Sequence, residues 1–345
     1  MKKLTAQIRF NWVVLVFIYL VIIAGSLVRV TGSGMGCPDW PKCFGYWVPP
    51  TTEEVLPENY QENYVAYRVK KIDRFTGFLK KLGLSETAEN VKNDPNLTNE
   101  QPFNAARTWT EYGNRLCGAL AGLGMLIGWI WVTFRTKFRK IKWIYSINLI
   151  ILVIQAWFGS IVVASNLVPW TITLHMFLAL VIVALHLWIL HLLQIERAKQ
   201  EPEKQLPNLV FPTWFKALLI ISAIITTYQM FLGTQVREMI DELTIQGWTR
   251  DDWSSMLGLP YLIHRSFAWL VLLLIVFMTI FNEANGKYKV IRSIGILLLI
   301  ELVTGITLAY ANMPAVSQVA HLLFASVLFG IFLKVLLNQY IKTAK

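Results

Sequence analysis

The sequence contains a stretch from Trp143 to Ile195 without a single Asp, Glu, Lys or Arg residue, and this stretch constrains the fold more than any other feature. A helix needs about 20 mostly apolar residues to cross the hydrocarbon core of a bilayer. The stretch is therefore long enough to cross twice, and Asn166 and Pro169 near its middle favour a turn between the two crossings. Because 55% of all residues are apolar and only 15% are charged, the composition excludes a soluble globular domain and a disordered chain.

Eight apolar stretches in the chain have the length of a membrane span. They cover roughly residues 11–29, 115–134, 143–164, 171–194, 215–236, 262–281, 293–310 and 316–337. The first stretch follows a basic N-terminus and continues without a clear cleavage site, so we interpret it as a retained anchor rather than a signal peptide. The sequence therefore predicts an all-α integral membrane protein with eight transmembrane helices.

Positive charge gathers on one side of this topology. With the N-terminus inside, the inner segments hold 18 of the 32 Lys and Arg residues but only 4 of the 21 Asp and Glu residues. Cytoplasmic loops of membrane proteins carry such an excess of basic residues. We therefore expect both termini in the cytoplasm, and we assign the net charge of +11 to these loops rather than to a nucleic-acid site.

The two halves of the chain repeat the same residue types at the same spacing. The matched sets are Gly159 with Gly305, His175 with His321, Gln155 with Glu301, Asn114-Arg115 with His264-Arg265, and Val28-Arg29 with Val236-Arg237. Four spans return the chain to its starting side, so the halves would be related by an axis along the membrane normal. We expect two pseudo-symmetric four-helix bundles, one in residues 1–195 and one in residues 196–345.

Three histidines, His175, His264 and His321, lie near the outer ends of three separate spans. Ionisable residues within spans are costly and usually face a cavity or a partner. Imidazole is also the usual axial ligand of haem iron, so His264 and His321 form a natural pair of ligands in the second half. The alternative is that each ring forms a hydrogen bond to a neighbouring helix.

The first half has one imidazole fewer, because Asn114 stands where the repeat predicts a partner for His175. Asparagine is a poor haem ligand, so this pocket should bind iron less tightly or leave one face open, which suits a substrate. Glu111 lies three residues before Asn114, on the same helix face. Its carboxyl group is a candidate for proton transfer, and the alternative is a favourable interaction with the helix dipole.

Further charged groups lie at the outer boundary or within a span. Arg29, Arg115, Arg237 and Arg265 are candidates to bind either haem propionates or lipid headgroups. Glu301 lies within a span, and the sequence shows no charge that compensates it.

One large segment, residues 30–110, is expected on the outer side. It contains Cys37 and Cys43, followed by a polar, helix-prone stretch around residues 58–93. An oxidising compartment would allow the two cysteines to form a disulfide that closes a short loop. A zinc site is the weaker interpretation, because no histidine or further cysteine lies nearby. The segment would either cover a site or dock a partner.

Several of these motifs resemble the haem A synthase family. They are residues 27–34 (Leu-Val-Arg-Val-Thr-Gly-Ser-Gly) leading into Cys37-Pro-Asp-Trp-Pro-Lys-Cys43, then Glu111-Tyr-Gly-Asn-Arg115, Gln155 with Gly159, Thr173-x-His175, His264-Arg265 and His321. The resemblance covers nearly the whole chain. It implies a bacterial inner-membrane oxidoreductase that converts the C8 methyl group of haem O to a formyl group by successive hydroxylations, giving haem A for cytochrome oxidase. Many members of the family carry histidine where this chain has Asn114.

The resemblance also implies roles for individual residues. His264 and His321 would ligate haem b, His175 and Asn114 would line the pocket of the substrate haem O, and Glu111 would be the essential acid. Cys37 and Cys43 would be a redox-active or structural pair. Besides membrane lipid, the implied partners are haem O synthase, cytochrome oxidase assembly factors and an electron acceptor, with no nucleic acid.

Two other functions remain open from the residues alone. A transmembrane b-type electron-transfer cytochrome would bind haem without modifying it, but its ligands are usually stacked across the membrane. A transporter built on a repeat would place its site near the midplane, whereas the three histidines and Glu111 lie off the midplane.

Overall fold

The computed structural model describes residues 2–34, 36–39, 41–93, 102–164, 169–204, 209–249, 253 and 256–339. Within them, apart from an isolated bridge between Cys43 and Tyr46, the regular structure is helical. The long apolar helices are α1 (Lys2–Val30), α4 (Ala105–Arg135), α5 (Arg139–Ala164), α6 (Pro169–Gln200), α7 (Thr213–Ile245), α9 (Leu259–Asn285), α10 (Lys289–Tyr310) and α11 (Ala315–Gln339). All eight are long and apolar enough to span a membrane, which confirms the predicted fold class of an all-α membrane protein. The turn expected at Asn166 lies outside the described residues.

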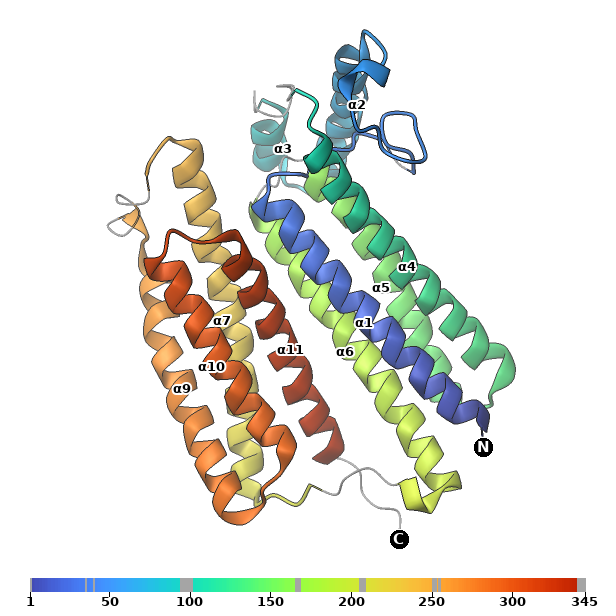
Figure 1. The fold of residues 1–345 in the computed structure, drawn as a ribbon, viewed down its shortest axis with the longest axis vertical. Helices are drawn as coiled ribbons and strands as arrows, with labels where there is room; N and C mark the ends of the chain where they lie inside the picture. Colours follow the sequence, from blue (N-terminus) through green and yellow to red (C-terminus); the bar gives the residue numbers. More distant parts are fainter. Residues whose placement is uncertain are drawn as a thin grey trace.

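The eight helices form two groups of four, α1, α4, α5 and α6 in one and α7, α9, α10 and α11 in the other (Figure 1). In each group the first helix packs on the second, the third on the fourth, the first on the fourth and the second on the third. Each group also has its own core of buried aliphatic and aromatic side chains. This shared packing pattern supports the pseudo-symmetry that we propose between the halves.

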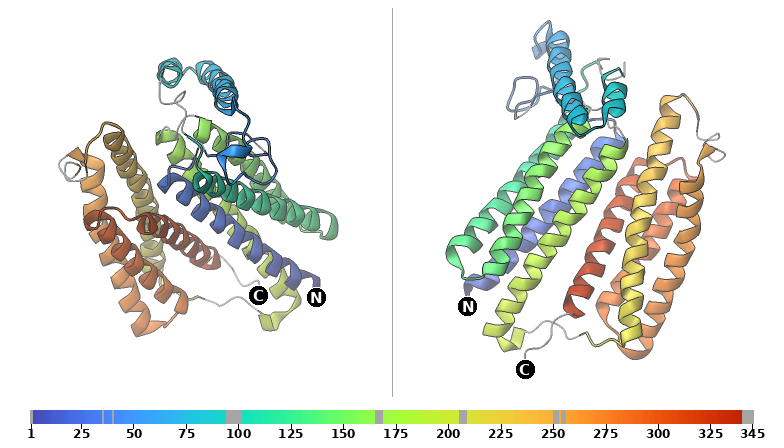
Figure 2. Two further views of the ribbon diagram at one scale, coloured as in Figure 1. Left: turned by 45° about the horizontal axis from the view of Figure 1, so that its top comes forward. Right: turned by 180° about the vertical axis from the view of Figure 1, so that it is seen from behind.

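The two groups meet along α1 and α6 on one side and α7 and α11 on the other (Figure 2). Polar contacts link them within this apolar interface, since the Thr173 hydroxyl donates to Thr234 Oγ1 at 3.1 Å. Where α1 ends, Arg29 Nη2 lies 2.8 Å from Asp241 Oδ2 of α7. An ion pair that is partly shielded from water holds the halves together more firmly than a fully exposed one.

The helix-prone stretch of the outer segment forms two helices, α2 (Tyr60–Lys81) and α3 (Ser85–Lys92), after a short 3₁₀ turn at Glu53–Val55. They lie over one end of the first group, and α1 begins and α11 ends at the opposite end (Figures 1 and 2). Phe75 and Leu79 of α2 pack in one apolar cluster with Phe158 and Ile161 of α5. The outer segment is therefore anchored on the end of α5 by buried apolar area.

Candidate functional site

Each of the three histidines lies against a glycine of the helix with which its own helix pairs. The pairs are Gly159 of α5 with His175 of α6, Gly233 of α7 with His264 of α9, and Gly305 of α10 with His321 of α11. A Cβ atom added to these glycines would lie 3.0, 3.4 and 3.4 Å from the respective ring Cε1 atoms. Glycine therefore allows each imidazole to approach the neighbouring backbone closely.

The fourth helix pair has the same arrangement with an asparagine. A Cβ atom on Gly25 of α1 would lie 3.8 Å from Asn114 Oδ1 of α4. The structure therefore places Asn114 where the other three pairs carry an imidazole. Gly25 and Gly233 were missed in the sequence, although both lie four residues before a matched arginine, Arg29 or Arg237.

Glutamine side chains cross-link two of these helix pairs. Gln155 Nε2 donates to the backbone oxygen of His175 at 2.9 Å, and Gln229 Nε2 donates to the backbone oxygen of His264 at 3.2 Å. Each glutamine lies four residues before the glycine of its pair. The Nδ1 atoms of both histidine rings are buried and have no hydrogen-bond partner among the described residues.

His321 differs from these two histidines because its ring has partners. Its Nδ1 atom lies 3.0 Å from Glu301 Oε2 and 2.9 Å from Thr304 Oγ1, both on α10. Glu301 therefore has a hydrogen-bond partner that the sequence did not reveal. Its partner lies on the neighbouring helix, twenty positions further along the chain, and becomes visible only when α10 and α11 pack.

The donor set of the second half fits haem iron. His264 and His321 come from two different helices, α9 and α11, of the same four-helix group. Contacts at Nδ1 of His321 leave its Nε2 atom as the coordinating atom, which is the usual arrangement for a metal-bound histidine. Two imidazoles of this kind can bind a haem iron from its two faces.

Glu111 lies beneath the loop that Cys37 and Cys43 close with the predicted disulfide, which the structure contains. The Glu111 side chain is buried, its Oε2 atom accepts the Cys37 backbone N–H at 2.7 Å, and its Oε1 atom pairs with Arg115 one turn later. The Arg115 guanidinium also donates to the backbone oxygens of Cys37 and Asp39, both at 2.5 Å. The disulfide loop therefore holds the Glu111 carboxylate through the Cys37 N–H group, and Arg115 holds it through an ion pair.

Gly36 brings this loop into direct contact with α4. Its backbone oxygen accepts the Thr108 hydroxyl at 2.8 Å, and an added Cβ atom would lie 2.7 Å from the backbone carbon and oxygen of Arg107. Because a helix backbone cannot move aside, Gly36→Ala should lower the free energy of unfolding by about 1–3 kcal/mol. The check is thermal unfolding of the detergent-solubilised protein. Gly77→Ala is the matched control, since a Cβ atom there meets nothing within 4 Å and alanine favours the helix.

Of the remaining candidate arginines, Arg29 and Arg237 share one carboxylate, and Arg265 has a different neighbour. Arg237 Nη2 pairs at 2.7 Å with Asp241, the residue that also binds Arg29, while Arg265 lies over the ring of Tyr261 at 5.9 Å. The Nε atoms of Arg29 and Arg237 are buried without a hydrogen-bond partner among the described residues. Binding of propionates or headgroups by these arginines stays a prediction.

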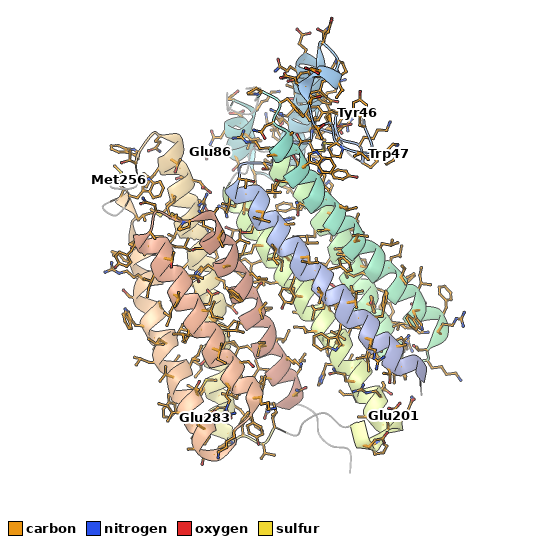
Figure 3. The ribbon with its side chains drawn as sticks, viewed as in Figure 1. Tyr46, Trp47, Glu86, Glu201, Met256 and Glu283 are labelled. Atoms are coloured by element: carbon orange, nitrogen blue, oxygen red, sulfur yellow. A yellow bond between two sulfur atoms is a disulfide. The ribbon has the colours of Figure 1, made fainter. Side chains whose placement is uncertain are left out.

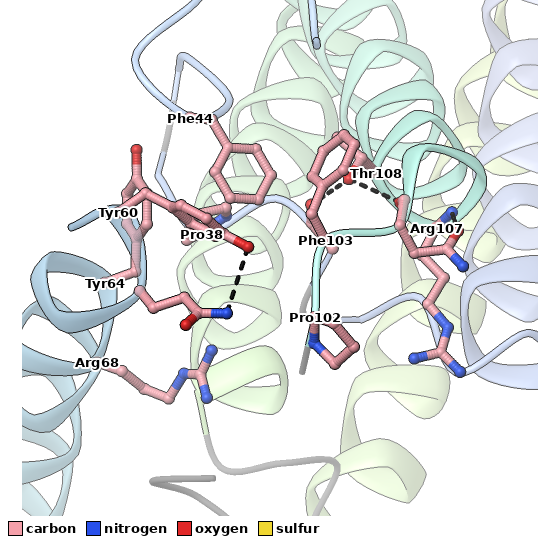
Figure 4. A pocket seen from close by; sticks show the side chains of 12 residues that line it. Pro38, Phe44, Tyr60, Tyr64, Arg68, Pro102, Phe103, Arg107 and Thr108 are labelled. Carbon is pink, nitrogen blue, oxygen red and sulfur yellow. Dashed lines mark hydrogen bonds between the residues drawn. The ribbon is translucent and has the colours of Figure 1, made fainter. Parts of the chain in front are cut away.

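A small cavity lies between the disulfide loop, α2 and the start of α4, and its volume is about 50 Å³ (Figure 4). It has room for one or two water molecules but not for a tetrapyrrole. Burial, and then the nearby Asp39 carboxylate, raise the pKa of the Tyr64 phenol on its wall to about 12, so this group stays a neutral donor. None of the three histidines lines this cavity.

The loop after the disulfide carries exposed aromatic side chains. Tyr46 and Trp47 project from it beside the start of α4, with 45% and 65% of their surfaces exposed (Figure 3). The Tyr112 hydroxyl of α4 donates to the Trp47 backbone oxygen at 2.9 Å. Aromatic residues of this kind are enriched where membrane proteins meet the membrane–water interface.

The chain is similar to known proteins over nearly its whole length. The model of the COX15-CtaA family, described as cytochrome oxidase assembly protein, matches residues 8–333. A heme A synthase of Wolbachia pipientis wMel is 25% identical over 336 residues, which cover 91% of this chain and 87% of the relative. A heme A synthase of Pelagibacter ubique is 24% identical, covering 89% and 91%, and one of Shouchella clausii is 23% identical, covering 90% of each.

Proposed function

Because this chain belongs to the COX15-CtaA family of cytochrome oxidase assembly proteins, we propose that it is a haem A synthase, a membrane oxidoreductase that converts haem O to haem A. Its reaction would oxidise the C8 methyl group of haem O to a formyl group by successive hydroxylations. The observation that carries the proposal is the repeated contact between an imidazole and a glycine in three helix pairs, with an asparagine in the fourth. This arrangement suits one permanently bound haem and one exchangeable haem.

The C-terminal half, residues 196–345, would hold haem b between His264 and His321. When bound, haem b would supply a one-electron carrier for the oxidation. The protein contributes the position and orientation of both imidazoles, through Gly233 and Gly305 behind the rings and through Glu301 at His321.

The N-terminal half, residues 1–195, would hold haem O as the substrate. His175 would face its iron from one side, and the weak ligand Asn114 would leave room for the substrate to enter and leave. Glu111 lies one turn before Asn114 on α4, where its carboxylate would take up a proton released during oxidation of the methyl group. Arg115 and the disulfide loop hold this carboxylate in place.

The outer segment would cover the substrate site. The Phe158 ring lies against the His175 ring, with their centroids 6.3 Å apart, and the same phenylalanine packs on α2. We place this end at the outer face of the bacterial inner membrane and both termini in the cytoplasm, in accord with the distribution of basic residues. Haem O synthase would supply the substrate, cytochrome oxidase assembly factors would receive the product, and a separate acceptor would take the electrons.

The haem content of the purified protein tests this function. From cells that make haem O, we expect haem B together with haem O or haem A, measured by extraction, chromatography and a reduced-minus-oxidised spectrum. Haem B alone would favour an electron-transfer cytochrome. A protein without any haem would overturn both functions.

A further inference from the structure

In each of the four helix pairs, one side chain lies four residues before the glycine that faces the imidazole or Asn114. This side chain is a carboxylate in only one pair. This position holds Val21 in α1, Gln155 in α5, Gln229 in α7 and Glu301 in α10. A carboxylate inside a membrane-spanning helix is costly, so a residue of this kind normally has a partner and a function.

The contacts of these side chains differ as well as their charge. Gln155 and Gln229 bind the backbone oxygens of their histidines, whereas Glu301 Oε2 lies 3.0 Å from Nδ1 of the His321 ring itself. The Glu301 side chain is only 11% exposed, and its other oxygen has no partner among the described residues. The Glu301 carboxylate therefore contacts an imidazole ring, that of His321, whereas the two glutamines contact only backbone oxygens.

Thr304 indicates which nitrogen of His321 carries the proton. Its hydroxyl donates to the backbone oxygen of Ile300 at 2.9 Å, so its lone pairs face His321 Nδ1 at 2.9 Å. The carboxylate of Glu301 is also an acceptor. Two acceptors around one ring nitrogen require an N–H group there, which leaves the lone pair on Nε2.

We propose that Glu301 is a positioning residue for haem b that fixes His321 as the Nε2 ligand, makes it the more basic of the two axial ligands, and lowers the reduction potential of the haem. This inference rests on the proposed function, because it takes haem b as the group that His264 and His321 bind. A carboxylate that accepts the second N–H of a metal-bound histidine orients the ring and raises its basicity. A more basic ligand and a nearby negative charge stabilise the oxidised iron, which carries the higher positive charge.

The two imidazoles that would hold haem b are then unequal. His264 has no partner at Nδ1 among the described residues, and the side chain four residues before its glycine is the neutral Gln229. The lowering of the haem b reduction potential is therefore due to the contact between Glu301 and His321.

Glu301→Gln in the full-length protein tests the inference, because glutamine is accepted at the matched position of two other helix pairs. We expect the variant to keep haem b. Its equilibrium between oxidised and reduced haem should shift about tenfold toward the reduced form, which is about 59 mV in midpoint potential for one electron. The readout is an optical redox titration of the purified protein. Thr304→Val, which removes the weaker acceptor, should shift the potential in the same direction by less.

Gln155→Glu is the matched control, because it introduces the same carboxyl group at the equivalent position of the other half and should leave the haem b potential unchanged. A Glu301→Gln protein with bound haem and an unchanged potential would overturn the inference and leave the proposed function intact. If Glu301→Gln loses its haem, the haem b potential of Thr304→Val decides the matter. An unchanged potential in that variant would overturn the inference. A wild-type protein without haem b would overturn the proposed function itself.

Discussion

Glu111→Gln should keep the haem b spectrum and reduce haem A formation by about 10²–10⁴-fold, the usual effect of losing a general acid or base. Glutamine has nearly the shape of glutamate, and its amide oxygen can still accept the Cys37 N–H that Glu111 accepts at 2.7 Å. The substitution therefore removes the charge and the site for a proton while it retains the packing of the disulfide loop. Haem b would be bound in the other half and should be unaffected.

The measurement is haem extraction and chromatography from cells that express the variant in place of the wild-type protein. Glu283→Gln is the matched control, because Glu283 is an exposed carboxylate at the opposite end of the bundle and pairs with Arg292 at 2.5 Å (Figure 3). Exposed ion pairs contribute little to stability, so this variant should make haem A normally. Full activity in Glu111→Gln would remove Glu111 from the mechanism.

Membrane spans are the part of this fold that the sequence predicts best. In a bilayer every backbone polar group must find a partner within the protein, which restricts the chain to helices of defined length. All eight expected spans are present as helices, and the stretch from 58 to 93 forms α2 and α3. The expected short disulfide between Cys37 and Cys43 is present too.

Contacts between distant elements are the part that the sequence does not predict. The bond between Cys37 and Glu111 joins residues 74 positions apart, and nothing in either motif identifies the other as its partner. The partner of Glu301 was missed for a related reason. Which faces of α10 and α11 meet depends on how both helices are rotated when they pack. Of the four glycines that face an imidazole or Asn114, only Gly159 and Gly305 stood out from the sequence, because the spacing in the other two helix pairs is interrupted by the outer segment or by a longer loop.

His264→Ala and His321→Ala should each abolish the low-spin b-type spectrum, whereas His175→Ala should retain it. An iron that loses one of two imidazoles keeps a single strong ligand, and alanine leaves an apolar gap in its place. His175 lies in the other half, so its loss would affect only binding of the substrate haem. The test is a reduced-minus-oxidised spectrum of the three purified variants, each normalised to protein.

His264→Ala and His321→Ala should differ in their effect on the stability of the fold. His321→Ala also leaves Glu301, with a side chain only 11% exposed, without its partner, and a buried group that loses its partner costs about 1–3 kcal/mol or more when it is charged. His264→Ala leaves no side chain stranded, because Gln229 binds the backbone oxygen of residue 264 rather than the ring. His321→Ala should therefore unfold at a lower temperature than His264→Ala, and His321→Ala combined with Glu301→Gln should recover part of the difference. A b-type spectrum of normal intensity in either single alanine variant would contradict the assignment of that histidine as an axial ligand.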